Sequence, residues 1–326
     1  MQAAWYEAIG SAEEVLHVGK IDDPSPMEGE VLIEIKASGV NPSDVKTRAG
    51  ARGELQFPQI IPHSDGGGII VEVGEGVSED RIGERVWIWN GAFGRAYGTC
   101  AELMALPSSQ AVVMSEDVSF ETAACLGIPA STAYYGVFSD GSVENQTILI
   151  TGGAGAVGYL GIQLAKWSGA NVISTVSSDD KATVAKAAGA DLVVNYKTDD
   201  VIEAANDFTK GYGVDRILEV EFGGNLSVSE HVIKNNGIIA AYGSVAEANP
   251  SLPFYNLMFK GVKLNTYLIY IVPENDRVDI NKGITSALSD NALTPIIAES
   301  FNLSEIINAH QSLEEDSVIG NVVINI

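Results

Sequence analysis

Alternating apolar and polar positions dominate the first third of the chain and predict short strands separated by turns. Residues 31–36 (VLIEIK) alternate as a half-buried strand does, and residues 66–73 (GGGIIVEV) and 85–89 (RVWIW) continue the pattern. Glycine and proline punctuate the segments between these strands. We therefore expect an antiparallel or barrel-like unit that extends to about residue 122.

After this unit, short apolar strands alternate with helical stretches. The expected strands are residues 147–151, 171–176, 191–195, 214–220, 237–242 and 263–270. Helical segments such as 179–188 lie between most of them. Alternation of this kind is typical of a parallel sheet covered by helices on both faces.

The last part of the chain is too short to form a domain of its own. We expect a helical region after residue 270, a strand at 296–300, a helix at 304–313 and a closing strand at 321–326. Ser304 is the expected N-cap of that helix, with Glu305 in its first turn. We expect this tail to pack on the N-terminal unit, which makes the parallel-sheet domain an insertion.

An apolar strand leads into a glycine-rich turn, and an apolar helical stripe leads out of it. Residues 148–158 contain the pattern G-x-G-x-x-G. Such glycines let the backbone approach a pyrophosphate, whose charge is stabilised at the N-terminus of the helix. A glycine-rich turn without a ligand is the alternative, since the chain has 34 glycines. The residues expected to bind the cofactor here are Gly153, Ala154, Gly155, Ala156, Val157 and Gly158.

The end of the next strand favours NADPH over NADH. An NAD site places an acidic side chain about 20 residues after the turn, but residues 174–178 here are STVSS. Asp179 and Asp180 come slightly later, where we expect them to cap a helix. Small hydroxyl residues leave room for a 2′-phosphate, and Lys181 can supply positive charge. An ordinary exposed helix lysine is the alternative for Lys181.

The strongly negative net charge of the chain limits which partners and cofactors it can bind. The chain has 19 basic and 43 acidic residues and a net charge of −24, which disfavours nucleic acid and anionic membrane surfaces as partners. An anionic cofactor therefore needs a local positive pocket. No window of 18 consecutive apolar residues occurs, so we expect no membrane span. The first residues are typical of a strand rather than of a signal peptide.

Two cysteines, Cys100 and Cys125, are too few for a disulfide framework or a four-cysteine zinc site. We expect both to be small buried apolar residues. A cytoplasmic location is the default for such a chain.

Several short motifs follow one another in a specific order along nearly the whole chain. They are residues 39–44 (GVNPSD), 64–65 (SD), 97–102 (YGTCAE), 127–134 (GIPASTAY), 152–158, 195–196 (NY), 242–244 (YGS) and the end near His310. In this order they make the chain similar to the quinone oxidoreductase and zeta-crystallin branch of the medium-chain dehydrogenases/reductases.

This resemblance implies an α/β protein with two domains. A GroES-like, mainly-β barrel would form the substrate domain, residues 1–122 and 268–326. An inserted Rossmann domain with a doubly wound parallel sheet would occupy residues 123–267 and bind NADPH. The resemblance also implies a homodimer joined through the last Rossmann strand, near Lys263–Tyr270.

The resemblance carries cofactor residues over position by position. Lys181 and Tyr196 stand where relatives hold the 2′-phosphate, and Ser177 is the small residue beside it. The remaining positions face the nicotinamide end or the cofactor cleft, and they are Thr132, Asn225, Gly243 and Ser244.

Three positions depart from the pattern of the relatives. Asp316 replaces an arginine that some bacterial relatives place on the phosphate, which weakens the phosphate pocket or shifts its composition. Lys46 replaces an active-site tyrosine, and His63 replaces a glycine. The shape of the acceptor pocket, and so the substrate, is therefore expected to differ from the family type.

The zinc-dependent alcohol dehydrogenases share this architecture, but two of their ligand positions carry other residues here. Asn41 and Ser64 stand at the places of a cysteine and a histidine. None of the histidines pairs with a cysteine at ligand spacing. We therefore expect no metal site, with His63 a polar residue of a cleft or of the surface. His310 is expected on a helix face without a chemical role.

Without zinc to polarise an alcohol or ketone, the expected partner is a small acceptor that takes hydride readily, such as a quinone or an α,β-unsaturated carbonyl. The cofactor carries this chemistry, and the protein orients and shields it. Lys46 or His63 could stabilise negative charge on the acceptor oxygen. Packing without a chemical role is the alternative for each residue, above all for the tyrosine. The residues expected around the nicotinamide are Asn41, Lys46, His63, Thr132 and Tyr134.

Two other functions stay open at this point. One is a reductase of enone, alkenal or enoyl-thioester double bonds, for which quinone activity is incidental. The other is a nucleotide-binding or RNA-binding structural protein with little catalysis, against which the net charge of −24 speaks.

Overall fold

The structure is a computed structural model that describes residues 1–315 and 318–326. These residues divide into two compact units. Unit 1 comprises Met1–Ile128 and Pro295–Ile326, and unit 2 comprises Pro129–Thr294. Unit 2 is therefore an insertion in the chain of unit 1.

Unit 1 consists mainly of short strands. Its strands are β1 (Gln2–Trp5), β2 (His17–Lys20), β3 (Glu30–Val40), β4 (Asp65–Val73), β5 (Arg85–Ile88), β6 (Leu103–Pro107), β7 (Ala111–Val113), β14 (Ile297–Asn302) and β15 (Asn321–Asn325). Its α-helices are α1 (Ala12–Val15), α2 (Pro42–Arg48), α3 (Phe120–Ala123) and α11 (Ile306–Glu314). Short 3₁₀ turns lie at Glu79–Arg81, Ser108–Gln110 and Leu303–Glu305.

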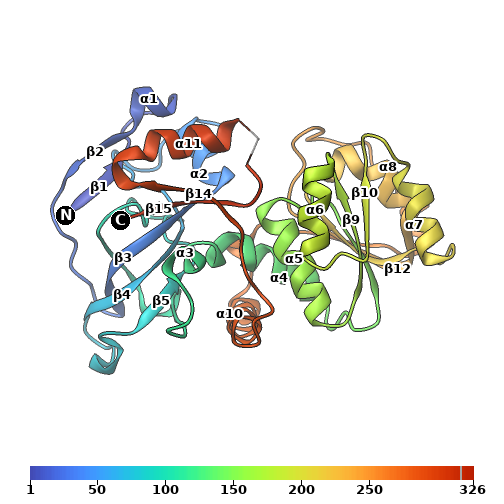
Figure 1. The fold of residues 1–326 in the computed structure, drawn as a ribbon. Helices are drawn as coiled ribbons and strands as arrows, with labels where there is room; N and C mark the ends of the chain where they lie inside the picture. Colours follow the sequence, from blue (N-terminus) through green and yellow to red (C-terminus); the bar gives the residue numbers. More distant parts are fainter. Residues whose placement is uncertain (316–317) are drawn as a thin grey trace. The chain divides into compact units, whose positions relative to one another are not determined.

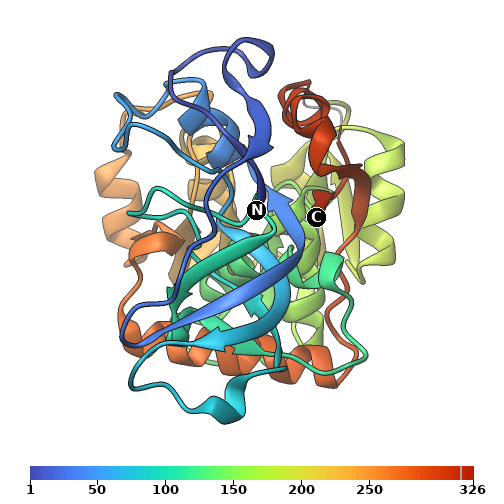
Figure 2. The same cartoon turned by 90° about the vertical axis from the view of Figure 1, so that its left-hand side faces the viewer.

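One sheet organises unit 1. Seven strands pair in the order β14-β15-β3-β4-β5-β7, with β6 also on β3, and β1 pairs separately with β2. Most of these pairs are antiparallel, while β14 and β15 run parallel. The core under this sheet is aliphatic, with Ile33, Ile35 and Ile70 fully buried. Figure 2 shows β3 (blue) crossing this unit.

Unit 2 alternates strands and helices. Its strands are β8 (Thr147–Ile150), β9 (Asn171–Val176), β10 (Leu192–Asn195), β11 (Val214–Glu219), β12 (Ile233–Ala241) and β13 (Lys263–Thr266). Its α-helices are α4 (Ser131–Phe138), α5 (Ala156–Trp167), α6 (Asp179–Ala187), α7 (Val201–Thr209), α8 (Phe222–Val232), α9 (Phe254–Lys260) and α10 (Glu274–Ser289). A π-helical turn, Leu126–Ala130, leads into α4, and a 3₁₀ turn, Ile269–Ile271, follows β13.

The six strands of unit 2 form one parallel sheet in the order β10-β9-β8-β11-β12-β13. Helices α5 and α6 lie along one face and α7 and α8 along the other (Figure 1). Because the chain winds outward from β8 in both directions, the strand order reverses beside β8. The carboxyl ends of the strands at such a reversal form the usual ligand crevice of an open parallel sheet.

The structure corrects three sequence expectations on element ends. The helix expected from residue 304 begins at Ile306, and Ser304 lies inside the preceding 3₁₀ turn, which Asn302 caps together with Glu305. Helix α6 is capped by Ser178, whose hydroxyl accepts the N–H of Lys181 at 3.3 Å. Asp179 and Asp180 lie in the first turn instead, where their charges favour the helix N-terminus.

The observed units also differ from the expected domain boundaries at residues 122 and 268. Residues 268–294 belong to unit 2 because α10 packs on α4. A Cβ on Gly283 of α10 would lie 2.1 Å from the ring of Tyr134, so the two helices approach closely at this point. Strand β13 ends at Thr266 rather than at residue 270. Among the described residues, no helix has both the length and the apolar character needed to cross a membrane.

Candidate cofactor and active site

The glycine turn of unit 2 follows β8 and ends at the N-terminus of α5. A Cβ on Gly153 would lie 1.9 Å from Ser174 Oγ, and a Cβ on Gly158 would lie 2.2 Å from the Gly152 carbonyl. Gly152 itself has a φ of +70°. Only glycine therefore lets the strand, the turn and the helix meet so closely.

The first turn of α5 directs backbone N–H groups at the space above the turn. Gly155 is the N-cap and is exposed, and Ala156, Val157 and Gly158 are the first residues of the helix. N–H groups at this end of a helix have no helical acceptor and favour an anion. The residues present therefore fit the pyrophosphate of a dinucleotide.

The ends of β9 and β10 bring the expected phosphate residues together. Asn195 pairs with Val176 in the parallel register, and the N–H of Tyr196 donates to the Val176 carbonyl at 3.1 Å. Ser177 and Tyr196 therefore follow paired residues at the same edge of the sheet. Lys181 is half-buried in the first turn of α6, and Tyr196 is 54% exposed. A lysine, a serine and a tyrosine therefore lie on or just after these two neighbouring strand ends. Asp316 lies outside the described residues.

A buried carboxylate ties the glycine turn to the next strand end. Glu219, at the end of β11, is fully buried and accepts the Thr151 hydroxyl at 2.8 Å and the Asn225 amide at 2.8 Å. The N–H of Glu221 and the hydroxyl of Ser229 also donate to it, at 2.8 and 3.3 Å. Burial raises the pKa of Glu219, while these hydrogen bonds oppose the shift. Asn225 is thus held on Glu219 at the carboxyl end of β11.

Gly243 and Ser244 lie just after β12, at the same edge of the sheet. A Cβ on Gly243 would lie 2.3 Å from the Val220 carbonyl, which explains the glycine. The Ser244 hydroxyl accepts the N–H of Gly223 at 2.9 Å and donates to the Glu247 carbonyl. The Ser244 hydroxyl therefore donates its proton within the protein, and its two hydrogen bonds stabilise the loop after β12.

Thr132 and Tyr134 occupy different faces of α4. Thr132 lies in the first turn and is 5% exposed, while the next residue, Ala133, approaches Gly161 of α5. Tyr134 packs its ring on Gly283 of α10 and on Phe138, 4.7 Å between ring centroids. These contacts support the packing interpretation of Tyr134 rather than a catalytic one.

In unit 1, Asn41 is held by two buried carboxylates. It caps α2, its backbone N–H donates to Asp44 at 2.9 Å, and its amide donates to Asp65 at 2.8 Å. Burial raises the pKa of Asp44 to about 7, although the N–H of Asn41 lowers it. Lys46 lies on the exposed side of the same helix. The structure therefore fixes Asn41 and leaves the Lys46 ammonium accessible.

The expectation that His63 lies in a cleft or on the surface is wrong, because its side chain is fully buried. Its Nδ1 lies 2.9 Å from Ser38 Oγ, and its Nε2 lies 3.0 Å from Nε2 of His310. The two imidazoles stack with 5.2 Å between centroids. His310 is likewise fully buried on α11 rather than free on a helix face.

The hydrogen-bond partners fix the proton positions of this pair. The Thr99 hydroxyl donates to the Asp65 carbonyl at 2.5 Å, so Ser38 must donate to Thr99, 2.7 Å away. Ser38 can then only accept from His63, which places the His63 proton on Nδ1. Its Nε2 accepts the Nε2–H of His310. Burial lowers the pKa of His63 well below its usual value and that of His310 to about 3, so both rings are neutral.

Sequence reasoning missed several of these contacts. Ser38 and Glu219 lie in none of the quoted motifs, and the motif around Thr99 does not reveal its hydrogen bonds, because the partners of all three residues are far away in the chain. One signal for the histidine pair was present, namely His63 at the place of a glycine. Its φ of 78° is the left-handed conformation that glycine tolerates best.

No group of three His, Cys, Asp or Glu side chains that could hold a metal ion occurs within residues 1–315 and 318–326. Cys100 and Cys125 are free and fully or almost fully buried, as expected. Burial raises the pKa of both thiols.

Two known domain families match most of the chain. Residues 27–140 match the alcohol dehydrogenase GroES-like domain, and residues 156–278 match the zinc-binding dehydrogenase family. A GroES-like domain with an inserted parallel-sheet domain is the predicted fold class, which is confirmed.

Individual relatives include reductases of similar length. The chain is 26% identical to the quinone oxidoreductase of Sus scrofa, over 89% of this chain and 87% of the relative. It is 28% identical to the 2-haloacrylate reductase of a Burkholderia species, over 94% and 92%. It is 30% identical to the synaptic vesicle membrane protein VAT-1 homolog of Rattus norvegicus over 68% of this chain, but spans 53% of that relative's length.

A solved structure extends the similarity to the whole chain. A mycobacterial protein in complex with NADPH matches 100% of both chains at 28% identity, with a TM-score of 0.86.

Proposed function

This chain belongs to the medium-chain dehydrogenase/reductase family, in its quinone oxidoreductase branch, and on that premise we propose that it transfers hydride from NADPH to a quinone or an α,β-unsaturated carbonyl. The observation that carries this proposal is the carboxyl edge of the unit 2 sheet. There the α5 N-terminus follows a turn that only glycine can form, and Ser177 and Tyr196 follow paired residues of β9 and β10.

Each group at this edge has a distinct task. The N–H groups of the first α5 turn bind the pyrophosphate. Lys181 and Tyr196 bind the 2′-phosphate, Lys181 by charge and Tyr196 through its hydroxyl, while Ser177 leaves room for it. Glu219 keeps Thr151 and Asn225 in place beneath the cofactor. When bound, NADPH supplies the hydride.

Negative charge on the acceptor needs a cation or a proton donor. As hydride adds to a quinone or to an activated C=C bond, charge builds on the carbonyl oxygen, which then takes a proton from solvent. Lys46 is an accessible cation of unit 1, and we assign it to this charge. His63 is not proposed for this task, since it is buried, neutral and bonded at both ring nitrogens.

Stopped-flow oxidation of NADPH, followed at its nicotinamide absorbance, tests the function. A benzoquinone, a naphthoquinone and an unsaturated ketone are offered side by side to the purified protein. We expect NADPH to be consumed with at least one acceptor. Absence of oxidation with all three, although NADPH binds, would overturn the proposed reaction.

Similarity to the 2-haloacrylate reductase favours one second candidate, reduction of an activated carbon–carbon double bond as the main reaction. The same assay separates the two, because a double-bond reductase turns over the unsaturated ketone faster than either quinone.

The two free, buried cysteines also support our proposal that the protein works in the reducing cytoplasm.

A further inference from the structure

Helix α4 is tied to the unit 2 sheet near both of its ends. Tyr267, the first residue after the edge strand β13, donates its hydroxyl to the carbonyl of Thr132 at 2.8 Å. At the other end, the Arg216 guanidinium of β11 donates to the carbonyl of Gly136 at 2.8 Å. A cation suits this position, because the last carbonyls of a helix have no helical partner and carry negative partial charge.

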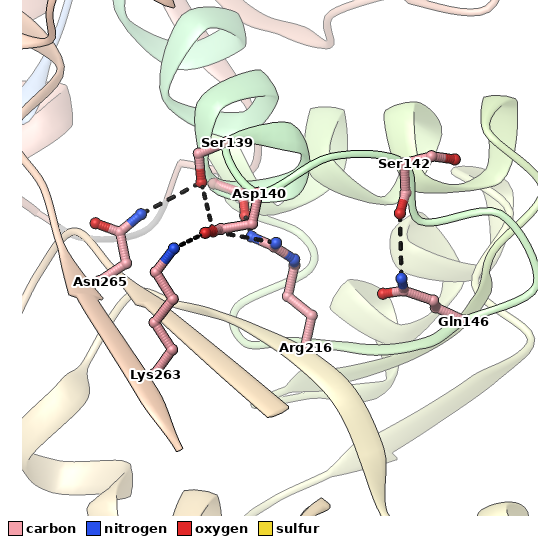
Figure 3. Close-up of polar contacts among 8 residues, drawn as sticks. Ser139, Asp140, Ser142, Gln146, Arg216, Lys263 and Asn265 are labelled. Atoms are coloured by element: carbon pink, nitrogen blue, oxygen red, sulfur yellow. Dashed lines mark hydrogen bonds and ion pairs between the residues drawn. The ribbon is translucent and has the colours of Figure 1, made fainter. Parts of the chain in front are cut away.

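Asp140, just after α4, joins these ties to the edge strand (Figure 3). Its carboxylate, on a side chain that is 9% exposed, accepts Arg216 at 3.2 Å and forms an ion pair with Lys263 of β13. Ser139 donates to Asp140 at 3.0 Å and accepts the amide of Asn265, also on β13, at 3.2 Å. We call Tyr267, Arg216, Asp140 and Lys263 the α4 clamp.

The chain enters α4 through an irregular turn, so contacts from the sheet contribute to holding the helix in place. A π-helical turn with Pro129 inside it precedes the helix, and proline removes a backbone donor there. The packing of α4 is also close, since a Cβ on Gly136 would lie 2.3 Å from Leu218 and 2.4 Å from the Tyr267 hydroxyl. The clamp therefore fixes the position of Thr132 along the helix axis from the sheet side.

We propose that Tyr267 and Lys263 are positioning residues for hydride transfer, which act through α4 on Thr132 and make turnover depend on the edge strand β13. This inference rests on the proposed function and on the place that the resemblance implies for Thr132, facing the nicotinamide. It goes further by naming residues that touch neither cofactor nor acceptor. Any displacement of β13 reaches Thr132 through the Tyr267 hydroxyl and the Lys263–Asp140 pair.

Tyr267→Phe removes one hydroxyl and keeps the ring between Tyr135 and Tyr242, with centroids at 5.0 and 6.1 Å. We expect kcat to fall about threefold to tenfold, the worth of one hydrogen bond. The Kd of NADPH should stay within about twofold of wild type, because the phosphate-binding residues are untouched. The primary isotope effect from 4-deuterated NADPH should rise, because the hydride step itself slows.

Lys263→Met is a second variant that tests the proposal. The Lys263 side chain is 63% exposed, and its loss leaves Asp140 paired with Arg216. We expect a smaller fall in kcat with the same rise in isotope effect, and Lys263→Arg should restore both. Tyr212→Phe, at a ring that is 82% exposed, is the matched control.

The outcomes are distinct for the two proposals. If wild-type protein reduces no acceptor, the proposed function fails and this inference fails with it. If wild type is active but both variants keep its kcat and isotope effect, only the inference fails. If cofactor affinity and kcat fall together with the melting temperature, the clamp is merely structural, which also overturns the inference.

Discussion

His63 has a left-handed backbone, with a φ of 78°, inside the core of unit 1. This conformation costs a residue with a Cβ about 1 to 2 kcal/mol. The hydrogen bonds to Ser38 and His310 offset that cost, because they leave both nitrogens of the buried ring satisfied. The pair stays neutral, with one proton on each ring.

The His63–His310 pair should therefore not titrate near neutral pH. Both pKa values are lowered in the folded state, so the stability that neutral rings provide is full above pH 6.5 and falls toward pH 3. Asp44 acts oppositely, since its raised pKa of about 7 gives stability at low pH that is lost between 3.8 and 7. The free energy of global unfolding contains both contributions, so the protonation of each histidine is best measured directly.

Nitrogen-15 NMR of the ring nitrogens gives that measurement. We expect both histidines to stay neutral at pH 5, with the His63 proton on Nδ1 and the His310 proton on Nε2. His17 and the exposed His231 serve as internal references, since their rings lie outside this hydrogen-bonded chain. A ring of the pair that titrates between pH 5.5 and 7.5 would contradict the assignment.

Lys181 and Tyr196 carry the prediction on cofactor choice. Lys181→Ala should weaken NADPH binding about tenfold and Tyr196→Phe by less, because charge-assisted bonds to phosphate are the stronger ones. NADH binding should change little, since NADH lacks the 2′-phosphate. Fluorescence titration of both cofactors measures the two dissociation constants. Lys186→Ala, in the last turn of the same helix, is the control, and equal weakening of NADPH and NADH would refute the assignment.

Among the elements, β11 and the glycine turn depend on one carboxylate. Glu219 joins the end of the strand to Thr151 before the turn and to Asn225 in α8. Three segments distant in the chain thus share a single acceptor, whose removal leaves several buried donors without a partner.

Glu219→Ala should lower the free energy of unfolding by about 3 kcal/mol, because unsatisfied buried donors cost about 1 to 3 kcal/mol each. Urea denaturation measures this loss, and NADPH affinity should fall as well. Glu203→Ala, at an exposed position of α7, should change the stability by less than about 0.5 kcal/mol. Equal effects of the two substitutions would show that Glu219 does not organise the turn.

For the molecule as a whole, the edge strand β13 of the unit 2 sheet offers a surface for a partner, with β10 as the other edge strand of this sheet. It pairs with β12 on one side only, and large apolar side chains beside it are exposed, among them Leu264, Leu268 and Ile271. An uncovered edge with apolar neighbours favours strand addition. We therefore propose a homodimer joined through β13, as the resemblance implies.

Light scattering after gel filtration tests this proposal. Wild-type protein should have a mass of twice 34.4 kDa, and Leu264→Lys should shift it toward the monomer by placing a charge at the edge. Val18→Lys, on the exposed face of β2, should leave the mass unchanged. A wild-type monomer at micromolar concentration would contradict the proposal.

Local pattern was enough to predict most elements and the glycine turn between β8 and α5. A short apolar run predicted β9 with its observed bounds, Asn171–Val176, and the glycine pattern located the turn before α5. Cap positions were missed by one or two residues, as at Ser178 and Asn302, because several neighbouring polar side chains can each cap a helix. Residues such as Arg216 and Tyr267 carried no signal, since their partners lie about 80 and 135 positions away.

The sequence by itself determined the fold class and the family, because these depend on periodicity and on short motifs in a fixed order. It also placed Ser177 and Tyr196 at neighbouring strand ends, since parallel strands align their carboxyl ends. Only the tertiary structure decided that His63 is a neutral, buried partner of His310. It alone decided that the edge strand holds α4 through Tyr267 and Lys263. The reason is physical: burial and hydrogen-bond partners are set by contacts across the fold, which no local pattern records.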